Sequence, residues 1–427
     1  MISHKKNIII LTGSLFKSVV RAIHSYEKKT KTKFRICLLR DIKERKNHQE
    51  TKQSTNIDII ITCDTHDPSS IQKSLLPYKD QIFSVTTRGE YHIPLLARIV
   101  PHVPYIKNPT SESLLWATDK LLMRRRINIH NKKINPKYTV VVDTSKKTLK
   151  KINKKIGFPL IVKPTGLAAS QFVSICFHKE ELEAILKKMF KKIQIAADKK
   201  TSHKEQKILV EQFMEGDMYS VDAYVTSRGK IHFCPMVHVK TGNTIGFDDF
   251  FGYRQITPTL LKNQNIEKAH AVASEAIHAL GLRSTTVHIE LMKMEDLWKV
   301  IELSPRLGGF RHNLYEYSFG INHTMNDILI HAGKKLSIPR KRKGYTVAMK
   351  FFAKKEGRLT KLKGIKKAQK LASFKTIKIN KHIGDMCTYA KNGGGSVFNI
   401  IMFNKERSKL LADIRRLEQM IVIETKK

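Results

Sequence analysis

Residues 288–309 read HIELMKMEDLWKVIELSPRLGG, and this stretch decides the fold more clearly than any other part of the chain. Two runs that alternate apolar and polar residues flank a polar turn at 294–296, as expected of a β-hairpin. If the hairpin closes about residue 296, Glu290 lies opposite Glu302, and His288 lies opposite Ser304. Directly opposed residues have Cβ atoms roughly 5 Å apart, so the two carboxylates would repel each other.

A bound cation would relieve that repulsion, and ligand sets made only of oxygen favour Mg²⁺. Arg306 follows the second strand within one turn, where it can bind phosphate oxygens with two parallel hydrogen bonds. The hairpin therefore indicates a site for a metal and a phosphate. The alternative is a solvated sheet face on which both glutamates are simply hydrated.

Composition limits the class of protein. The chain has 427 residues, 41% of them hydrophobic, which suits roughly two to four domains with ordinary cores. No stretch approaches the ~20 apolar residues of a membrane span, so we expect no membrane insertion. The five cysteines are scattered and lack metal-ligand spacing, which is typical of reduced thiols and favours a cytoplasmic location.

The formal net charge of +42 suggests an anionic partner. However, lysine outnumbers arginine about three to one, whereas base and phosphate recognition favours arginine. The lysines also extend over the whole chain. We therefore do not expect nucleic acid as a partner and attribute the charge to a lysine-rich composition, which also attracts anionic substrates such as nucleotides.

The first part of the chain alternates strand-like and helical patterns. Apolar runs at 7–11, 34–39, 58–62 and 82–85 are separated by helical spacing, which predicts a parallel sheet with crossover helices. A proline-rich break at 101–109 marks a domain boundary. A basic linker at 340–343 precedes a final region of short strands and one helix.

Three further motifs lie between these boundaries. Lys120 lies in a predicted helix. Lys163 ends a short strand and precedes the small-residue loop 164–170, whose backbone amides can approach an anion closely. Glu211 opens a strand end that can present backbone groups and a carboxylate to a purine. Taken alone, the loop at 164–170 could equally be a flexible turn. The strand end at Glu211 could equally be an ordinary strand end with exposed acids.

The series of motifs resembles the ATP-grasp superfamily in its order along the chain: Lys120, Lys163, the acidic hinge that begins at Glu211, and the hairpin. Within that superfamily it resembles the biotin-carboxylase-like carboxylate–amine ligases of the amino-acid and dipeptide ligase type. The matching motifs cover residues 119–333. The resemblance implies a mixed α/β and α+β fold in three parts: a Rossmann-like pre-ATP-grasp domain at 1–108, a two-lobed ATP-grasp domain at 109–338, and a β-rich C-terminal domain at 339–427.

The resemblance also implies roles for individual residues. The residues expected to bind ATP are Lys120, Lys163, Gly166, Ser170, Glu211, Gln212, Phe213, Met214 and Asp217. The expected Mg²⁺ ligands are Glu290, Glu302 and Ser304. Arg306 would hold the γ-phosphate and, with Lys163, act in catalysis. Ser304 departs from the asparagine that many members carry, and Gly166 is the one glycine of the phosphate loop.

The implied activity is an ATP- and Mg²⁺-dependent ligation of a small-molecule carboxylate to an amine, through an acyl phosphate and with release of ADP and phosphate. Arg306, Arg311 and Arg254, with Gln255, are candidates for holding a substrate carboxylate. A homodimer is the default expectation. The alternative is a non-catalytic ATP- or polyanion-binding protein that kept the fold, which Ser304 and the net charge motivate.

Overall fold

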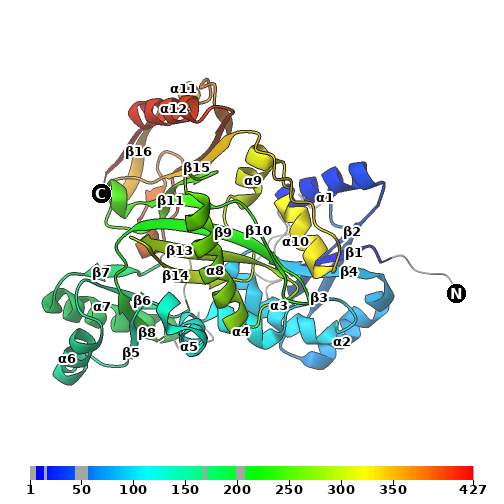
Figure 1. The fold of residues 1–427 in the computed structure, drawn as a ribbon, viewed down its shortest axis with the longest axis horizontal. Helices are drawn as coiled ribbons and strands as arrows, with labels where there is room; N and C mark the ends of the chain where they lie inside the picture. Colours follow the sequence, from blue (N-terminus) through cyan, green and yellow to red (C-terminus); the bar gives the residue numbers. More distant parts are fainter. Residues whose placement is uncertain (1–5, 14–16, 44–55, 167–170, 199–206, 427) are drawn as a thin grey trace.

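The computed structural model describes residues 6–13, 17–43, 56–166, 171–198 and 207–426. Within these ranges the strands form four sheets. The chain runs from the blue N-terminal region through a green central region to a red C-terminal helix (Figure 1).

The N-terminal region is a parallel sheet of four strands in the order β3-β2-β1-β4, as the sequence predicts. All five residues of the central strand β1 are buried, as expected of a parallel sheet covered on both faces. The strands are β1 (Ile8–Thr12), β2 (Arg35–Asp41), β3 (Ile59–Cys63) and β4 (Ile82–Thr87), and the helices are α1 (Lys17–Thr30), α2 (Pro68–Leu75) and α3 (Ile93–Ile99).

Two helices connect this region to the rest of the chain. The sequence suggested one helix around residues 118–120, but the structure has α4 (Ser111–Thr118) and α5 (Lys120–His130). Asp119 separates them because its side chain caps α5, accepting from the amides of Leu121 and Leu122 at 2.9 and 3.0 Å. Lys120 consequently stands at the first position of α5.

A small lobe follows, built on an antiparallel sheet in the order β5-β8-β6-β7. Two helices pack on it around a core of aliphatic side chains. Its elements are β5 (Tyr138–Val141), α6 (Lys146–Lys155), β6 (Leu160–Pro164), β7 (Ser174–Cys176), α7 (Lys179–Asp198) and β8 (Ile208–Gln212).

The centre of the molecule is a nine-stranded antiparallel sheet in the order β14-β13-β9-β11-β12-β15-β19-β17, with β10 added to β9. The strands up to β14 are β9 (Asp217–Val225), β10 (Ile231–Phe233), β11 (Val237–Thr241), β12 (Gly252–Thr257), β13 (Thr285–Met294) and β14 (Leu297–Ser304). The helices of this part are α8 (Asn263–Ala279), α9 (Arg311–Phe319) and α10 (His323–His331).

Alternation along β13 gives this sheet two different faces. Val287, Ile289 and Leu291 pack with α8 and α5 in one apolar core, and α8 lies across these strands in Figure 1. His288 and Glu290 point to the opposite face. Helices α9 and α10 cover part of that face, and α10 also contacts the N-terminal region. The functional residues therefore lie between the central sheet and the N-terminal region.

The C-terminal region shares the central sheet, because β15 pairs with β12 and β19 pairs with β15. The boundary expected at 338/339 thus separates two stretches of sequence whose strands hydrogen-bond in one sheet. A small sheet β18-β16-β20 completes this β-rich region. Its elements are β15 (Tyr345–Phe351), β16 (Gly357–Lys363), α11 (Ile365–Ala368), β17 (Phe374–Ile379), β18 (Met386–Cys387), β19 (Phe398–Asn404), α12 (Arg407–Met420) and β20 (Val422–Lys426).

Candidate active site

The β13–β14 hairpin opposes two glutamates as expected from the sequence. Glu290 pairs with Glu302, and His288 pairs with Ser304. The Glu290 and Glu302 side chains are about one-third exposed, at 33% and 30%. Two carboxylates that are partly accessible and face one another are a suitable donor set for a hard cation.

This register depends on a bulge. The turn has two residues, 295 and 296, so Met294 pairs with Leu297 and Leu291 pairs with Val300. The pairing then shifts by one residue, which leaves Ile301 as the extra residue and sets Glu290 against Glu302. Without the shift, Glu302 would point away from Glu290. The sequence-based register was correct because the bulge compensates for the shorter turn.

Lys120 neutralises one of the glutamates. Its Nζ lies 3.1 Å from Oε1 of Glu302, and its side chain is buried. Burial alone would lower the pKa of Lys120, but Glu302 more than offsets it and the pKa ends above its ordinary value. Lys120 is therefore held as a cation beside Glu302.

Lys163 lies on β6 in a buried cluster with Glu211 and Arg124. Its Nζ is 2.8 Å from Oε2 of Glu211, while Nε of Arg124 is 2.6 Å from Oε1. Burial would raise the pKa of Glu211, but Arg124 and then Lys163 bring it down to about 2. Both oxygens of Glu211 pair with cations in this structure, and its expected adenine-reading role stays a prediction.

Arg306 and Ser304 share a partner that the sequence did not reveal. Glu90, in a single 3₁₀ turn after β4, accepts from Arg306 Nε and Ser304 Oγ, each at 2.7 Å. Burial would lower the pKa of Arg306, but Glu90 raises it. The N-terminal region thus contributes an acid to the end of the hairpin, and Ser304 donates to that acid.

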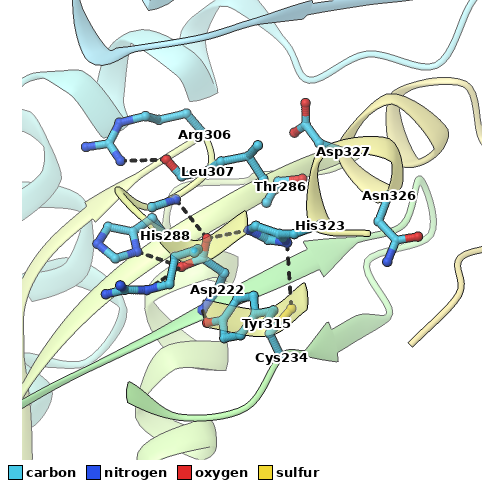
Figure 2. A network of polar contacts seen from close by, with 12 residues as sticks. Asp222, Cys234, Thr286, His288, Arg306, Leu307, Tyr315, His323, Asn326 and Asp327 are labelled. Carbon is cyan, nitrogen blue, oxygen red and sulfur yellow. Dashed lines mark hydrogen bonds and ion pairs between the residues drawn. The ribbon is translucent and has the colours of Figure 1, made fainter. Parts of the chain in front are cut away.

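Beside the hairpin, on the neighbouring strand β9, Asp222 lies between two histidines (Figure 2). It accepts from His288 Nδ1 at 2.7 Å and from His323 Nε2 at 2.8 Å, and it also accepts from the Gly308 amide at 2.8 Å. Burial would raise the pKa of Asp222, but His288 and His323 hold it well below its usual range. The other ring nitrogen of His288, Nε2, lies 3.4 Å from Glu290. A continuous chain of polar groups therefore runs from Asp222 through His288 to that glutamate.

Gly308 must lack a side chain at this point. A Cβ added to it would lie 2.5 Å from Nδ1 of His288, well inside contact distance. The close approach lets the Gly308 amide donate to Asp222. This bond fixes the loop that carries Arg306, because the two residues are separated by Leu307 alone.

Arg311, expected from the sequence to hold a substrate carboxylate, is buried in this structure, and that role stays a prediction. It begins α9 and is 2% exposed. Its guanidinium donates to Gln255 Oε1 at 2.6 Å and to Ser220 Oγ at 2.5 Å. Arg254 was also expected near the substrate, but residues alternate along β12, so it points to the face opposite Gln255. The structure does not bring Arg254 to the glutamates.

The expected adenine hinge follows β8. The amides of Gln212 and Phe213 donate to Lys137 and Pro159 carbonyls at 2.8 and 3.3 Å. Met214 is buried, Asp217 is exposed at the start of β9, and Gly166 follows β6. Ser170 lies outside the described residues. The ATP-binding assignments at these positions stay predictions.

A comparison with protein-family models matches the ATP-grasp domain to residues 156–313. This match runs from the small lobe through the hairpin to Arg306 and the start of α9. The chain contains an ATP-grasp domain. The two facing glutamates, Lys163 and the strand before the hinge all lie within the matched ATP-grasp residues.

Curated relatives match the ATP-grasp part of the chain. The alanine–anticapsin ligase of Bacillus amyloliquefaciens is 27% identical over 240 residues, which are 53% of this chain and 49% of that protein. The formate-dependent phosphoribosylglycinamide formyltransferase of Wolinella succinogenes is 27% identical over 160 residues, or 37% of each chain. The chain spans about half the length, or less, of these curated relatives.

Solved structures extend the likeness beyond the ATP-grasp domain. An L-amino acid ligase from Bacillus licheniformis has a TM-score of 0.76 and 16% identity, with 99% of this chain and 100% of that chain covered. An N5-carboxyaminoimidazole ribonucleotide synthetase from Thermotoga maritima has a TM-score of 0.68 and 15% identity, with 98% and 100% covered. At such identities the likeness establishes the fold, including the N- and C-terminal regions.

The donor set of the ATP-grasp domain fits Mg²⁺ only as part of a nucleotide complex. No group of three or more His, Cys, Asp or Glu side chains that could hold a metal occurs among the described residues. Glu290 and Glu302 would supply two carboxylates, and phosphate oxygens and water would have to complete an octahedral shell.

Three residues of the site could not be predicted from the sequence because none lies in a recognisable motif: Glu90, Arg124 and Asp222.

Proposed function

We propose that this protein is an ATP- and Mg²⁺-dependent ligase that joins a carboxylate to an amine through an acyl phosphate. One observation supports this most strongly: Glu290 and Glu302 face each other beside Lys120, with Arg306 one turn away. Paired carboxylates beside two cations support the binding of a metal-bound triphosphate here. The ligase names of the relatives agree with the proposal.

The proposed reaction has two steps. A carboxylate oxygen attacks the γ-phosphorus, the bond to the β–γ bridging oxygen breaks, and ADP leaves. The amine nitrogen then attacks the carbonyl carbon of the acyl phosphate, phosphate leaves, and the proton lost from nitrogen passes to solvent. Protein groups in such transfers mainly position the reactants and offset charge. Mg²⁺, when bound, would draw charge from the phosphate oxygens.

Individual side chains have distinct parts in this scheme. Glu290 and Glu302 hold the metal. Lys120 and Lys163 neutralise the α- and β-phosphates, for which each must turn from its present carboxylate partner. Arg306 stabilises the γ-phosphate and the acyl phosphate. Gln212, Phe213 and Met214 bind adenine through their backbone, Asp217 binds ribose, and the loop at Gly166 and Ser170 covers the phosphates.

Several properties of the whole protein belong to this proposal. Its substrates are a small-molecule carboxylate and amine. Among the described residues, no helix combines the length and apolar character required to cross a bilayer. Cytoplasmic location, a homodimer and domain limits near residues 108 and 338 stay predictions.

A substrate screen tests the activity directly. The purified protein is incubated with MgATP and pairs drawn from the twenty L-amino acids, and phosphate release is followed before products are measured by mass. We expect ADP, phosphate and a product whose mass equals both substrates minus water. The same acids are offered with hydroxylamine, which traps an acyl phosphate as a hydroxamate.

The binding-protein alternative makes the opposite prediction. Its supporting observation is Ser304, whose hydroxyl donates to Glu90 at 2.7 Å. If no pair releases phosphate, no hydroxamate forms and the protein binds RNA in a salt-sensitive manner, the ligase proposal is wrong. MgADP binding without turnover would select a nucleotide-binding protein.

A further inference from the structure

Lys350 occupies the active-site face of the central sheet, although it belongs to the C-terminal region. Register shows this strand by strand. Glu302 pairs with Glu290, and Glu290 pairs with Ser220 on β9. Ser220 in turn pairs with Val237 on β11. Directly paired residues point to the same face, so these four side chains share one face of the sheet.

The same face continues into β15. Val239 follows Val237 by two residues on β11 and therefore points to the same face. It pairs with Gln255, and Gln255 pairs with Ala348. Lys350 follows two residues later and therefore points to this same face. Arg311 spans part of the distance, because it donates to both Ser220 and Gln255. Glu290, Glu302 and Lys350 thus lie on one continuous face of the sheet.

The ammonium of Lys350 has an unusual environment. It lies 5.6 Å from the ring centroid of Phe310. It makes no ion pair or side-chain hydrogen bond with any residue in the described part of the chain. Arg306 and Arg311, two other cations on this face, both have oxygen partners. Lys350 is thus a half-buried cation of this face that can bind an anionic ligand.

Phe310 is itself held in an unfavourable conformation. Its φ of +60° lies in the left-handed region, which bulky side chains rarely adopt. It caps α9 and directly follows the Arg306-Leu-Gly-Gly loop. Residues held in such conformations concentrate at ligand sites, which supports a functional reason for placing this ring beside the lysine.

We propose that Lys350, packed beside Phe310, binds a second carboxylate of a substrate, one that does not react. The proposal rests on the ligase function proposed above. The reacting carboxylate must meet the γ-phosphate near Arg306 and the two glutamates. Strands β9, β11 and β12 separate those glutamates from β15. A carboxylate held by Lys350 is therefore a different group, either on the amine substrate or on the far end of the acid.

The charges around Lys350 agree with this assignment. Burial is the main influence and lowers the pKa of Lys350; Glu290 opposes that shift and Arg311 adds to it. These are the charged groups that act on the ammonium from β13 and α9. A bound carboxylate would form a charge-assisted hydrogen bond and restore the favourable environment that burial removes.

Matched substrate pairs test the proposal in two arms. In the first arm the amine is offered with and without its own carboxylate, as L-alanine against L-alaninamide. In the second arm the acid is offered with and without a distal carboxylate, as succinate against butyrate. The measured quantity is the ratio of kcat/KM within each pair. We expect a ratio of about ten or more in one arm, as expected for one charge-assisted hydrogen bond, and that arm identifies the substrate that Lys350 binds.

Lys350→Met should bring that ratio close to one, whereas Lys350→Arg should retain most of it. Lys363→Met, at an exposed position of β16 in a separate sheet, is the matched control and should behave as the wild type. The KM for ATP should change less than twofold in all three variants. A ratio that Lys350→Met leaves unchanged, or a wild type with no preference in either arm, would overturn the assignment.

A labelling experiment separates this inference from the ligase proposal. Lysine acylation by a dilute N-hydroxysuccinimide ester is followed by peptide mass, with and without MgADP and either L-alanine or succinate. We expect selective protection of Lys350 by one of these probes, and none of Lys363. If turnover fails with every substrate but protection occurs, the ligase proposal falls and the carboxylate site stands. Absence of protection overturns the site.

Discussion

The guanidinium of Arg306 is paired with the carboxylate of Glu90, a residue 216 positions earlier in the chain, with Nε and Nη2 both 2.7 Å from the same oxygen. The pair joins the N-terminal region to the end of the hairpin. It also occupies the arginine that we propose for the γ-phosphate, so a nucleotide must compete with Glu90 for Arg306.

Replacing this carboxylate should strengthen nucleotide binding. In Glu90→Gln the guanidinium loses its anionic partner, and we expect MgATP to bind about three- to tenfold more tightly. Calorimetric titration with the Mg²⁺ complex of a non-hydrolysable ATP analogue, which keeps the γ-phosphate, measures the effect. Glu112→Gln, at an exposed position of α4, is the control. Weaker binding in Glu90→Gln would indicate that Glu90 orients Arg306 and does not compete with phosphate.

Removing one of the facing carboxylates should abolish metal-dependent turnover. Glu302→Gln keeps the shape of the side chain but removes a charge from the proposed metal site. We expect turnover to fall at least about a hundredfold and Mn²⁺ affinity, measured by electron paramagnetic resonance, to fall with it. The fold should persist, since this side chain is 30% exposed. Glu295→Gln in the hairpin turn is the control. Undiminished Mg²⁺-dependent turnover in Glu302→Gln would move the metal elsewhere.

The Glu211 cluster should make stability depend on acid pH. The pKa of Glu211 falls from 4.5 to about 2 in the folded protein. Its contribution to the free energy of unfolding is therefore complete above about pH 4.5 and is lost as the pH falls through about 2. The full contribution is of the order of 3 kcal/mol. Urea unfolding between pH 2.5 and 7 measures the loss.

Arg124→Met tests the cause of that dependence. Without the guanidinium, Glu211 keeps Lys163 alone, and we expect a loss of about 3–5 kcal/mol at pH 7. The acid-dependent loss should also shrink, because the pKa of Glu211 rises toward its unfolded value. Arg125→Met, on the exposed side of α5, should change neither quantity. Equal pH profiles for Arg124→Met and wild type would contradict this account.

Local patterns were sufficient to predict the N-terminal sheet and the register of the hairpin. Alternation of apolar and polar residues determines which face each residue takes, and that was enough to set Glu290 against Glu302. The bulge at Ile301 was not predictable, because no residue there demands one. The register was correct only because the assumed turn was one residue longer than the real one.

Residues that act across long separations could not be predicted. Lys350 reaches the site face through the strand order of the central sheet, which crosses the boundary expected at 338/339. Glu90 reaches the hairpin from a turn after β4 of the N-terminal sheet. Arg311 was expected to bind substrate because it follows the Arg306 loop. The structure buries it at the start of α9, where it donates to Ser220 and Gln255, and its substrate role stays a prediction. Position along the chain did not predict this burial.

The Asp222 cluster leads to the last prediction. Asp222→Asn keeps the shape of the side chain but replaces one acceptor oxygen with an amide that opposes an imidazole N–H. Because Asp222 is fully buried between His288 and His323, we expect a loss of about 3 kcal/mol in the free energy of unfolding. The pKa of His288, which Asp222 raises against the effect of burial, should fall, and ¹⁵N-histidine titration would detect this.

The same substitution should also weaken nucleotide binding, although Asp222 is fully buried. The Gly308 amide donates to Asp222 and thereby restrains the loop that carries Arg306. A freer loop should lower the affinity for a non-hydrolysable MgATP analogue several-fold. Asp296→Asn, in the exposed hairpin turn, controls for the loss of a charge. If Asp222→Asn is destabilised but binds the analogue as tightly as the wild type, Asp222 supports the fold without positioning Arg306.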